Sequence, residues 1–297
     1  MTSTPSEQMI AVLDFGSQYS QLISRRIREN KVYCRILPHD ISIEELKTLS
    51  PKGIFLSGGP ASVYADNAPM CDPDIFGLNI PIFGVCYGMQ LMAHLLGGKV
   101  EPVPTREYGF ANLFVDIHGD IFYGLPDDFS VWMSHGDSVS IVPDGFEAIA
   151  HTDTLPIAVM ADESRKFYGS QFHPEVVHTP LGKNIIANFL FRVCGCNPLW
   201  TMSSFIQQSI SEIRKRVKDD IVICGVSGGV DSTVLAALLY KAIGDQLKCI
   251  FVDNGLLRKN EANEVIAFFR NDLCIDLHFV DASERFLEKL SGCHLRG

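Results

Sequence analysis

The sequence lacks the long apolar runs of a membrane protein. No apolar stretch reaches the roughly 18 residues that a membrane-spanning helix needs, and the amino-terminal residues have neither the basic nor the apolar region of a signal peptide. Cysteine is too scattered for a disulfide framework, because nine cysteines, an odd number, are spread over 297 residues. We therefore expect no membrane association and a cytoplasmic protein with reduced thiols.

Basic charge is also scarce. The 25 Lys and Arg side chains are outnumbered by 35 Asp and Glu, which gives a formal net charge of −10. Nucleic-acid binders concentrate basic side chains, so we expect no nucleic-acid partner. The one basic cluster, Arg214-Lys215-Arg216, stands beside Asp219 and Asp220 and fits a solvated helix face.

The cysteines do not have the spacing that is typical of metal ligands. Cys194 and Cys196 are separated by one residue, and no second pair of ligands stands nearby. We interpret both as small buried residues and predict no metal site formed by protein ligands alone.

What the sequence has is enough apolar material for two folded domains. Hydrophobic residues make up 46% of a chain that is longer than one hydrophobic core usually supports. In the first part, strands are predicted at 10–13, 32–37, 53–56 and 81–85 and helices at 18–28 and 43–49. This alternation is typical of a mostly parallel sheet covered on both faces, with loops 14–18, 57–64 and 86–90 converging at the carboxyl ends of its strands.

The pattern changes after about residue 100. Short β-type runs at 113–117, 131–133, 139–142 and 157–160 predict antiparallel additions to the sheet, and a helix over 181–193 closes the first domain. A second α/β pattern follows, with helices at 203–217, 232–242, 260–269 and 283–290 and strands at 221–225, 248–252 and 277–280. Gly195 and Pro198 interrupt the helices, so we place a linker at 196–202 between domains at 9–195 and 203–297.

A reactive cysteine is indicated by Gly84-Val85-Cys86-Tyr87-Gly88-Met89-Gln90, which follows an apolar strand and precedes a helical run. A tight strand-to-helix turn exposes a nucleophile, and the amino terminus of the helix favours its anionic form. The flanking glycines permit a close backbone approach. Taken alone, Cys86 is more often a small buried residue than a nucleophile.

A base and an orienting group are supplied by Phe172-His173-Pro174-Glu175 at the end of another β-type run. His173 can take and return a proton, and Glu175 can fix its tautomer and favour the imidazolium. A lone histidine is more often structural, so the interpretation depends on the combination.

Together these segments resemble the triad-type glutamine amidotransferases, whose signature is a Gly-x-Cys-x-Gly-x-Gln elbow with a distant His-Pro-Glu. The resemblance implies that Cys86, His173 and Glu175 are catalytic and that the backbone N–H groups of Gly59 and Tyr87 form an oxyanion hole. It also places Gln90, Ser134, Gly136 and Asp137 around the substrate glutamine. By itself, the segment Ser57-Gly58-Gly59-Pro60 is less often an ordinary tight turn than part of such a site.

A phosphate-binding turn is predicted between the strand 221–225 and the helix 232–242. Its residues are Ser227, Gly228, Gly229, Val230, Asp231, Ser232 and Thr233. Two glycines let successive N–H groups face one concavity, and the helix end adds positive potential. No Gly-Lys-Ser/Thr follows, so this is not a P-loop. It resembles the loop of ATP pyrophosphatases, and Asp231 suits Mg²⁺ that bridges phosphate oxygens.

The order of the two domains resembles the GMP synthase family, as does the segment 251–258. The implied fold is α/β: an amidotransferase domain with a mostly parallel sheet and antiparallel additions, followed by an incomplete α/β ATP pyrophosphatase domain. The implied reaction is adenylylation of xanthosine monophosphate by ATP with Mg²⁺, then amination to GMP with ammonia from glutamine.

The resemblance stops near residue 292, and residues 293–297 do not continue the family pattern. Members of the family are homodimers, and we expect the dimerisation domain to be absent from this chain, which would then be competent for the glutaminase half alone. Truncation, a frameshift and a chosen fragment all remain open. So do a stand-alone glutaminase and a non-catalytic remnant.

Overall fold

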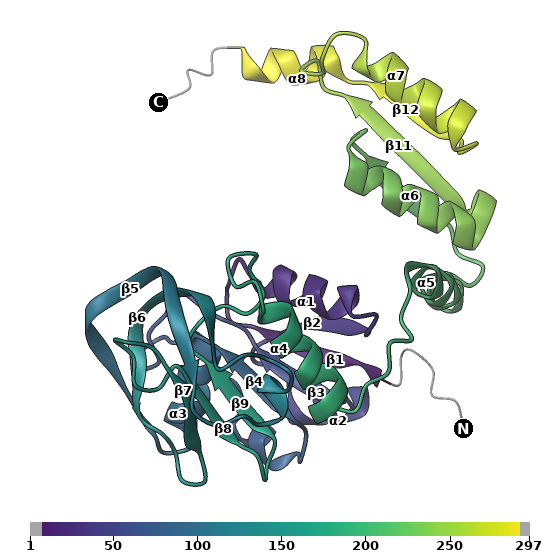
Figure 1. Ribbon diagram of the computed structural model, residues 1–297. Helices are drawn as coiled ribbons and strands as arrows, with labels where there is room; N and C mark the ends of the chain where they lie inside the picture. Colours follow the sequence, from purple (N-terminus) through teal and green to yellow (C-terminus); the bar gives the residue numbers. More distant parts are fainter. Residues whose placement is uncertain (1–7, 292–297) are drawn as a thin grey trace. The chain divides into compact units, whose positions relative to one another are not determined.

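The computed structural model describes residues 8–291, so the segment 293–297 singled out above lies outside the described residues. The chain divides into two compact units, Met1–Thr201 and Met202–Gly297 (Figure 1). Within residues 8–291, no helix is both long enough and apolar enough to span a bilayer.

The first unit is built on a nine-stranded sheet in the order β2-β1-β3-β4-β9-β8-β7-β5-β6 (Figure 1). Its strands are β1 (Ile10–Asp14), β2 (Cys34–Pro38), β3 (Gly53–Leu56), β4 (Ile82–Val85), β5 (Lys99–Val115), β6 (Asp128–Ile141), β7 (Glu147–His151), β8 (Val159–Asp162) and β9 (Phe167–Ser170). Its helices are α1 (Ser20–Glu29), α2 (Ile43–Leu49), α3 (Tyr87–Leu95) and α4 (Gly182–Asn188), with helical turns η2 (Pro73–Gly77), η3 (Asp120–Phe122) and η4 (Phe189–Val193).

The sheet is parallel in its first half and antiparallel in its second. Strands β2, β1, β3, β4 and β9 pair in parallel, whereas β9, β8, β7, β5 and β6 pair antiparallel. The predicted fold class, a mostly parallel α/β sheet with antiparallel additions, is confirmed. Parallel strands are buried on both faces, and all four apolar residues of β1 are fully buried.

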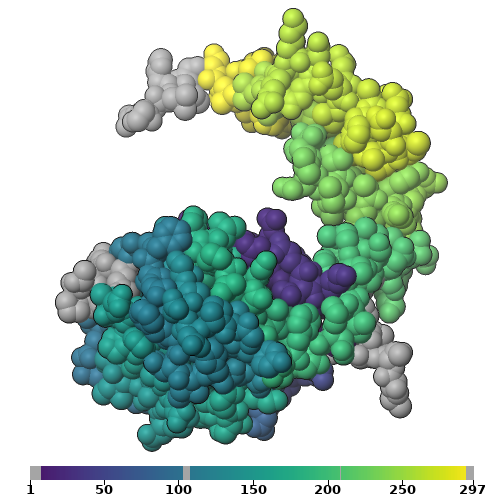
Figure 2. Space-filling model, viewed as in Figure 1, coloured from purple at the N-terminus to yellow at the C-terminus, as the bar shows by residue number. Residues whose placement is uncertain are grey.

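Each face of this sheet has its own hydrophobic core. Ile10 and Val12 of β1 pack on the side of α1 and α4, whereas Ala11 and Leu13 pack on the side of α2 and α3. The period of two along a strand separates the two sets. Figure 2 shows the blue and teal segments of this unit packed side by side on the viewed face.

Three predicted β-type runs differ in extent from the strands of the structure. Residues 131–133 and 139–141 belong to one strand, β6, and the run 113–117 overlaps only the last three residues of the long strand β5, which ends at Val115. Pairing with β5 across a register shift keeps β6 extended between the two predicted runs. Strand β7 was not predicted, and the helix expected over 181–193 is α4 followed by the π-helical turn η4.

The second unit holds a three-stranded parallel sheet in the order β10-β11-β12. Its strands are β10 (Val222–Val226), β11 (Leu247–Asp253) and β12 (Leu277–Asp281). Its helices are α5 (Met202–Val217), α6 (Val230–Ile243), α7 (Glu261–Ala267) and α8 (Ser283–Leu290), with helical turns η5 (Gly244–Gln246) and η6 (Phe268–Asp272). Helix α6 begins at Val230, before the predicted residue 232, because Gly229 is extended and its carbonyl accepts the Thr233 N–H.

One face of this second sheet exposes apolar side chains. Cys224 and Phe251 are buried on the covered face, whereas Ile223, Val252 and Val280 on the opposite face are 70%, 42% and 44% exposed. Apolar residues exposed singly are common, but three on neighbouring parallel strands leave this face only partly covered by the described residues.

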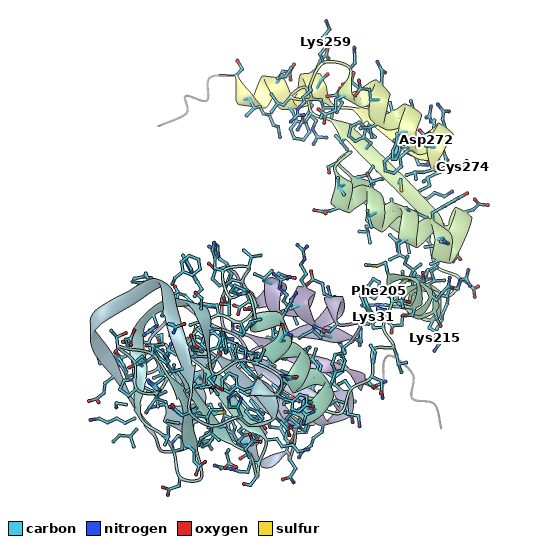
Figure 3. All side chains as sticks on the ribbon, in the orientation of Figure 1. Lys31, Phe205, Lys215, Lys259, Asp272 and Cys274 are labelled. Carbon is cyan, nitrogen blue, oxygen red and sulfur yellow. The ribbon has the colours of Figure 1, made fainter. Side chains whose placement is uncertain are left out.

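The basic cluster and the cysteines lie mostly as expected. Arg214 donates from Nε to the Ala242 carbonyl at the end of α6, 2.7 Å away, while Lys215 is exposed and projects from α5 (Figure 3). Cys194 and Cys196 are buried, which confirms their interpretation as small core residues.

Candidate active site

The turn between β4 and α3 holds Cys86 in a strained conformation. Its φ is 49° and its ψ is −107°, a region that residues other than glycine rarely adopt. A Cβ on Gly84 would lie 2.6 Å from the Gly88 backbone, and one on Gly88 would collide with the Leu56 carbonyl. The glycines of the Gly-x-Cys-x-Gly motif are therefore required by close backbone packing around the turn.

Cys86, His173 and Glu175 form a continuous chain of contacts. The Cys86 sulfur lies 3.3 Å from His173 Nε2, and His173 Nδ1 lies 2.7 Å from Glu175 Oε1. The Cys86 thiol also lies 3.2 Å from the carbonyl of Gln171. The side chains of Cys86, His173 and Glu175 are all buried. This is the geometry of a nucleophile, a base and an orienting group.

The charge on His173 follows from these neighbours. Burial by itself lowers the pKa of His173, but the Cys86 sulfur and the Glu175 carboxylate outweigh burial and raise the pKa to about 11. The imidazolium is therefore favoured near neutral pH. The ring is further enclosed by Tyr19, whose ring centroid lies 5.0 Å away in an edge-on arrangement.

A second histidine nearby behaves in the opposite way. Burial, together with the positive charge of His173, lowers the pKa of His135 to about 4, although Asp137 acts against this shift. His135 is therefore neutral near pH 7, and the ring in contact with the Cys86 sulfur is that of His173.

A hollow of about 560 Å³ opens in front of Cys86. It is lined by Gly59, Pro60, Ala61, Ser62, Tyr64, Cys86, Tyr87, Gln90, Pro102, Tyr108, Ser134, His135, Gly136 and Asp137. The predicted oxyanion-hole and glutamine-binding residues thus line the same cavity as the cysteine. The predicted convergence of loops 57–64 and 86–90 explains this arrangement, because both follow parallel strands of one sheet.

Gly59 and Tyr87 lie together beside the cysteine. A Cβ on Gly59 would lie 3.4 Å from the Tyr87 ring and 2.8 Å from the Phe15 carbonyl, so no side chain fits there. Tyr87 is the first residue of α3, and the first N–H groups of a helix have no partner within the helix. Both segments can therefore present N–H donors toward the cavity.

Residues that the sequence did not reveal orient Asp137. Its carboxylate accepts hydrogen bonds from Ser62 Oγ and from Tyr64 OH, the latter at 2.6 Å, and this bond raises the pKa of Tyr64. Gln90 Nε2 donates to the Asp137 carbonyl at 2.8 Å. Ser62 and Tyr64 lie in the loop 57–64 that was expected at the site, but no spacing in the sequence marked them individually.

The predicted phosphate-binding turn of the second unit is an ordered loop at the amino terminus of α6. Ser227 Oγ lies 3.1 Å from Ser232 Oγ and accepts the Gly229 N–H at 3.3 Å. Gly228 has a φ of +78°, and a Cβ there would lie 2.5 Å from Val265 Cγ2. The loop is exposed, as a surface that binds polyphosphate must be.

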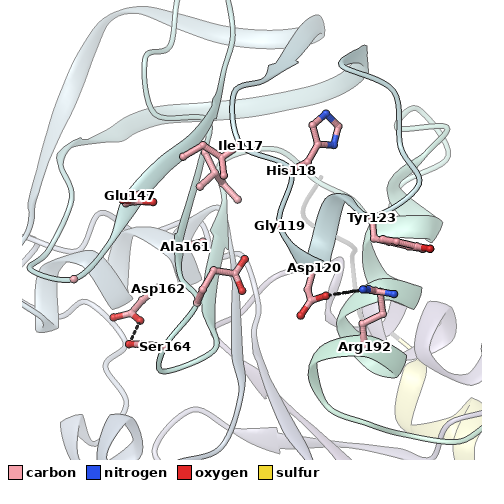
Figure 4. A pocket seen from close by; sticks show the side chains of 13 residues that line it. Ile117, His118, Gly119, Asp120, Tyr123, Glu147, Ala161, Asp162, Ser164 and Arg192 are labelled. Carbon is pink, nitrogen blue, oxygen red and sulfur yellow. Dashed lines mark hydrogen bonds and ion pairs between the residues drawn. The ribbon is translucent and has the colours of Figure 1, made fainter.

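Another hollow of about 610 Å³ lies elsewhere on the first unit (Figure 4). There Arg192 pairs with Asp120 at 2.9 Å and covers the ring of Tyr123 at 3.7 Å. The Asp162 carboxylate accepts hydrogen bonds from Ser164 Oγ and Arg165 Nε. Asp120 and Asp162 in this hollow are thus paired, and no cysteine lines it. We therefore place the candidate active site in the smaller hollow, beside Cys86. Within the described ranges, no cluster of side chains has the make-up of a metal site.

Comparisons with known proteins agree with this geometry. Residues 11–193 match the family model described as "Glutamine amidotransferase class-I", which covers more than half of the chain. The chain belongs to the class-I glutamine amidotransferase family. Residues 201–288 match a second model, described as "NAD synthase".

Proteins named "GMP synthase [glutamine-hydrolyzing]" are similar to this chain over nearly its whole length. The protein from Clostridium perfringens is 52% identical over 284 residues, 96% of this chain, and that from Carboxydothermus hydrogenoformans is 56% identical over 283 residues, 95% of this chain. The chain spans only 56% of the length of each relative.

A solved structure is similar in fold to the first unit. A protein from Thermoplasma acidophilum, described as a candidate GMP synthase subunit, is 34% identical with a TM-score of 0.56. The match covers 63% of this chain and 94% of that one.

Proposed function

We propose that the first unit hydrolyses the side-chain amide of glutamine and that Cys86 is its nucleophile. The observation that carries this proposal is the chain of contacts from Cys86 through His173 to Glu175, 3.3 and 2.7 Å long, behind the hollow of about 560 Å³. His173 is the general acid and base, and Glu175 orients its ring.

In the first half of the reaction, the Cys86 thiolate attacks the amide carbon of glutamine. The N–H groups of Gly59 and Tyr87 stabilise the oxyanion, a contribution typically worth about two to three powers of ten in rate. His173 gives a proton from Nε2 to the amide nitrogen, the carbon–nitrogen bond breaks and ammonia leaves. The product on the enzyme is a thioester between Cys86 and the glutamate γ-carbonyl.

In the second half, water attacks the thioester carbonyl. His173, now neutral, takes a proton from this water, and the same two N–H groups hold the second oxyanion. The carbon–sulfur bond breaks, glutamate leaves and Cys86 returns to the thiolate beside the imidazolium.

Four residues are proposed to bind the substrate glutamine: Gln90, Ser134, Gly136 and Asp137. All line the hollow together with Cys86. The Asp137 carboxylate, held by Ser62 and Tyr64, suits the α-ammonium group of glutamine because a fixed carboxylate loses little freedom on binding.

We further propose that the full-length protein is a GMP synthase. The names of the two relatives described above support this assignment and favour it over a stand-alone glutaminase or a non-catalytic remnant. In the proposed reaction, an oxygen of xanthosine monophosphate attacks the α-phosphate of ATP and pyrophosphate leaves. Ammonia then attacks the ring carbon that bears the adenylylated oxygen, the carbon–oxygen bond breaks and AMP leaves with that oxygen, which gives GMP.

Residues 227–233 are proposed to hold the phosphates of ATP, and Asp231 to hold Mg²⁺. Asp231 is exposed in the first turn of α6, and one carboxylate suits Mg²⁺, which keeps several waters and binds phosphate oxygens. When bound, Mg²⁺ supplies positive charge that neutralises the phosphates.

The family resemblance also supports a homodimeric full-length protein and a cytoplasmic location.

The glutaminase proposal is tested by measuring glutamate release from glutamine with the purified chain and with Cys86→Ala. The variant should keep the melting temperature and lose turnover, because only the sulfur is removed from a backbone set by Gly84 and Gly88. Turnover retained by the variant would show that Cys86 is not the nucleophile.

A further inference from the structure

The main chain of His173 is held outside any regular helix or strand. Strand β9 ends at Ser170, and residues 173–181 belong to no helix or strand. Pro174 has no N–H to donate. The His173 N–H donates to the Trp132 carbonyl of β6, 3.1 Å away, but this single bond leaves the His173 carbonyl to be satisfied by another group.

The hydroxyl of Thr179 supplies that group. Thr179 Oγ1 donates to the His173 carbonyl at 2.7 Å and accepts the Trp132 N–H at 3.1 Å. The backbone carbonyl of Trp132 is thereby paired with His173, and its backbone N–H is paired with Thr179. The hydroxyl thus joins the turn that carries His173 to strand β6.

Thr179 is itself fixed. Its N–H donates to the Val176 carbonyl at 3.2 Å, and its carbonyl accepts the Gly182 N–H at the start of α4 at 3.0 Å. The side chain is 2% exposed, so water cannot easily replace its hydroxyl. A rigid connection therefore runs from α4 through Thr179 to the backbone of His173.

We propose that Thr179 is a positioning residue for the reaction: its hydroxyl sets the backbone of His173 so that Nε2 faces the Cys86 sulfur. This inference rests on the proposed glutaminase function. Thr179 touches neither Cys86 nor the hollow, so it acts through His173 and not on glutamine. Small displacements matter here, because a shift of about 1 Å in a reacting group can lower a rate about 100-fold.

The test compares Thr179→Val with Thr179→Ser. Valine has the shape of threonine but lacks the hydroxyl, so it leaves the Trp132 N–H and the His173 carbonyl without their partner. Serine keeps the hydroxyl. We expect kcat for glutamine hydrolysis to fall on the order of 10- to 100-fold in the valine variant, with KM changed less than about threefold, and to be restored by serine.

Thr152→Val is the matched control. Thr152 is also buried, and its Oγ1 accepts the Leu155 N–H at 3.0 Å in a turn that carries no proposed site residue. This variant should lower the melting temperature about as much as Thr179→Val while its kcat stays unchanged. An equal loss of kcat in both valine variants, or no loss in Thr179→Val, would overturn the proposal.

A second readout does not need glutamine. The rate at which iodoacetamide alkylates Cys86 is measured against pH, with the modified peptide identified by mass. The parent chain and Thr179→Ser should share one profile, because in both the hydroxyl holds His173 so that Nε2 lies against the Cys86 sulfur. Thr179→Val should give a different profile, with slower alkylation near pH 7, because this contact is loosened.

The two readouts separate the two proposals. A parent chain that cannot hydrolyse glutamine would overturn the glutaminase function, yet the alkylation profiles would still report whether Thr179 sets the contact between His173 and Cys86. Identical profiles in all three proteins would overturn the role of Thr179 even if glutaminase activity were high.

Discussion

Glu175 Oε1 lies 2.7 Å from Nδ1 of His173, and this carboxylate is fully buried. Its other oxygen, Oε2, accepts no hydrogen bond from the residues that the structure describes. A buried carboxylate with one hydrogen bond is costly unless its partner carries the opposite charge. The pair therefore favours the imidazolium form of His173.

The first prediction concerns this pair. Glu175→Gln removes the negative charge but keeps an oxygen that can accept from Nδ1, so the proton transfer by His173 is weakened and not abolished. We expect kcat for glutamine hydrolysis to fall on the order of 10²–10³-fold, and to fall further in His173→Ala, which removes the acid and base itself. Steady-state kinetics on both variants decides this, and a larger loss for Glu175→Gln would contradict the assigned roles.

The second prediction concerns pH and His135. Its pKa is about 4 in the folded chain, below the ordinary value near 6.5, so the unfolded chain binds more protons between these two values. Stability must therefore fall as pH is lowered from about 6.5 to about 4, and part of this slope belongs to His135. His135→Gln should flatten the dependence of the melting temperature of the first unit on pH in that window.

The control for this effect is Thr152→Val. Thr152 is also buried in the first unit but carries no titratable group, so its replacement should leave the slope unchanged. An equal flattening in both variants would mean that the burial of His135 is not its cause.

The third prediction concerns the carboxylate of Asp137. Ser62→Ala and Tyr64→Phe each remove one of its hydrogen bonds and so leave the carboxylate less fixed in the hollow. We expect each change to raise KM for glutamine about 3- to 10-fold with kcat nearly constant, since the groups around Cys86 are untouched. Ser140→Ala, on the same strand as Asp137 but with a weak surface bond to the Lys99 carbonyl, should leave KM unchanged.

The parts of the site that could be predicted are local in sequence. The elbow from Gly84 to Gln90 could be predicted from its own residues, because the two glycines must pack closely around Cys86. The two-residue spacing of His173 and Glu175 likewise places both on one short turn. The resemblance to glutamine amidotransferases then brought the two segments together.

The parts that could not be predicted depend on contacts across the fold. Ser62 and Tyr64 reach Asp137 from more than 70 positions away, and nothing in their spacing distinguishes them from ordinary loop residues. Thr179 acts through a main chain whose place on β6 is set by tertiary packing. For the same reason β6 read as two short runs, since its pairing with β5 is invisible in its own sequence.

The last prediction concerns the loop 227–233, which is tested through binding and not through catalysis. Gly228 has a φ of +78°, and a Cβ there would lie 2.5 Å from Val265 Cγ2. Gly228→Ala must therefore shift the loop away from Val265 and out of the conformation in which successive N–H groups face one concavity. We expect the affinity for ATP with Mg²⁺, measured by calorimetry, to fall at least about 10-fold, since several N–H donors move together.

Gly225→Ala is the matched control for this change. Gly225 lies on β10, just before the loop, has no positive φ and has no atom within 4 Å of the Cβ position. Alanine fits there without strain, so the affinity for ATP should stay within about twofold of the parent. If Gly228→Ala binds ATP as tightly as Gly225→Ala, the phosphates do not lie against this loop, and the assignment of residues 227–233 fails while the glutaminase site stands.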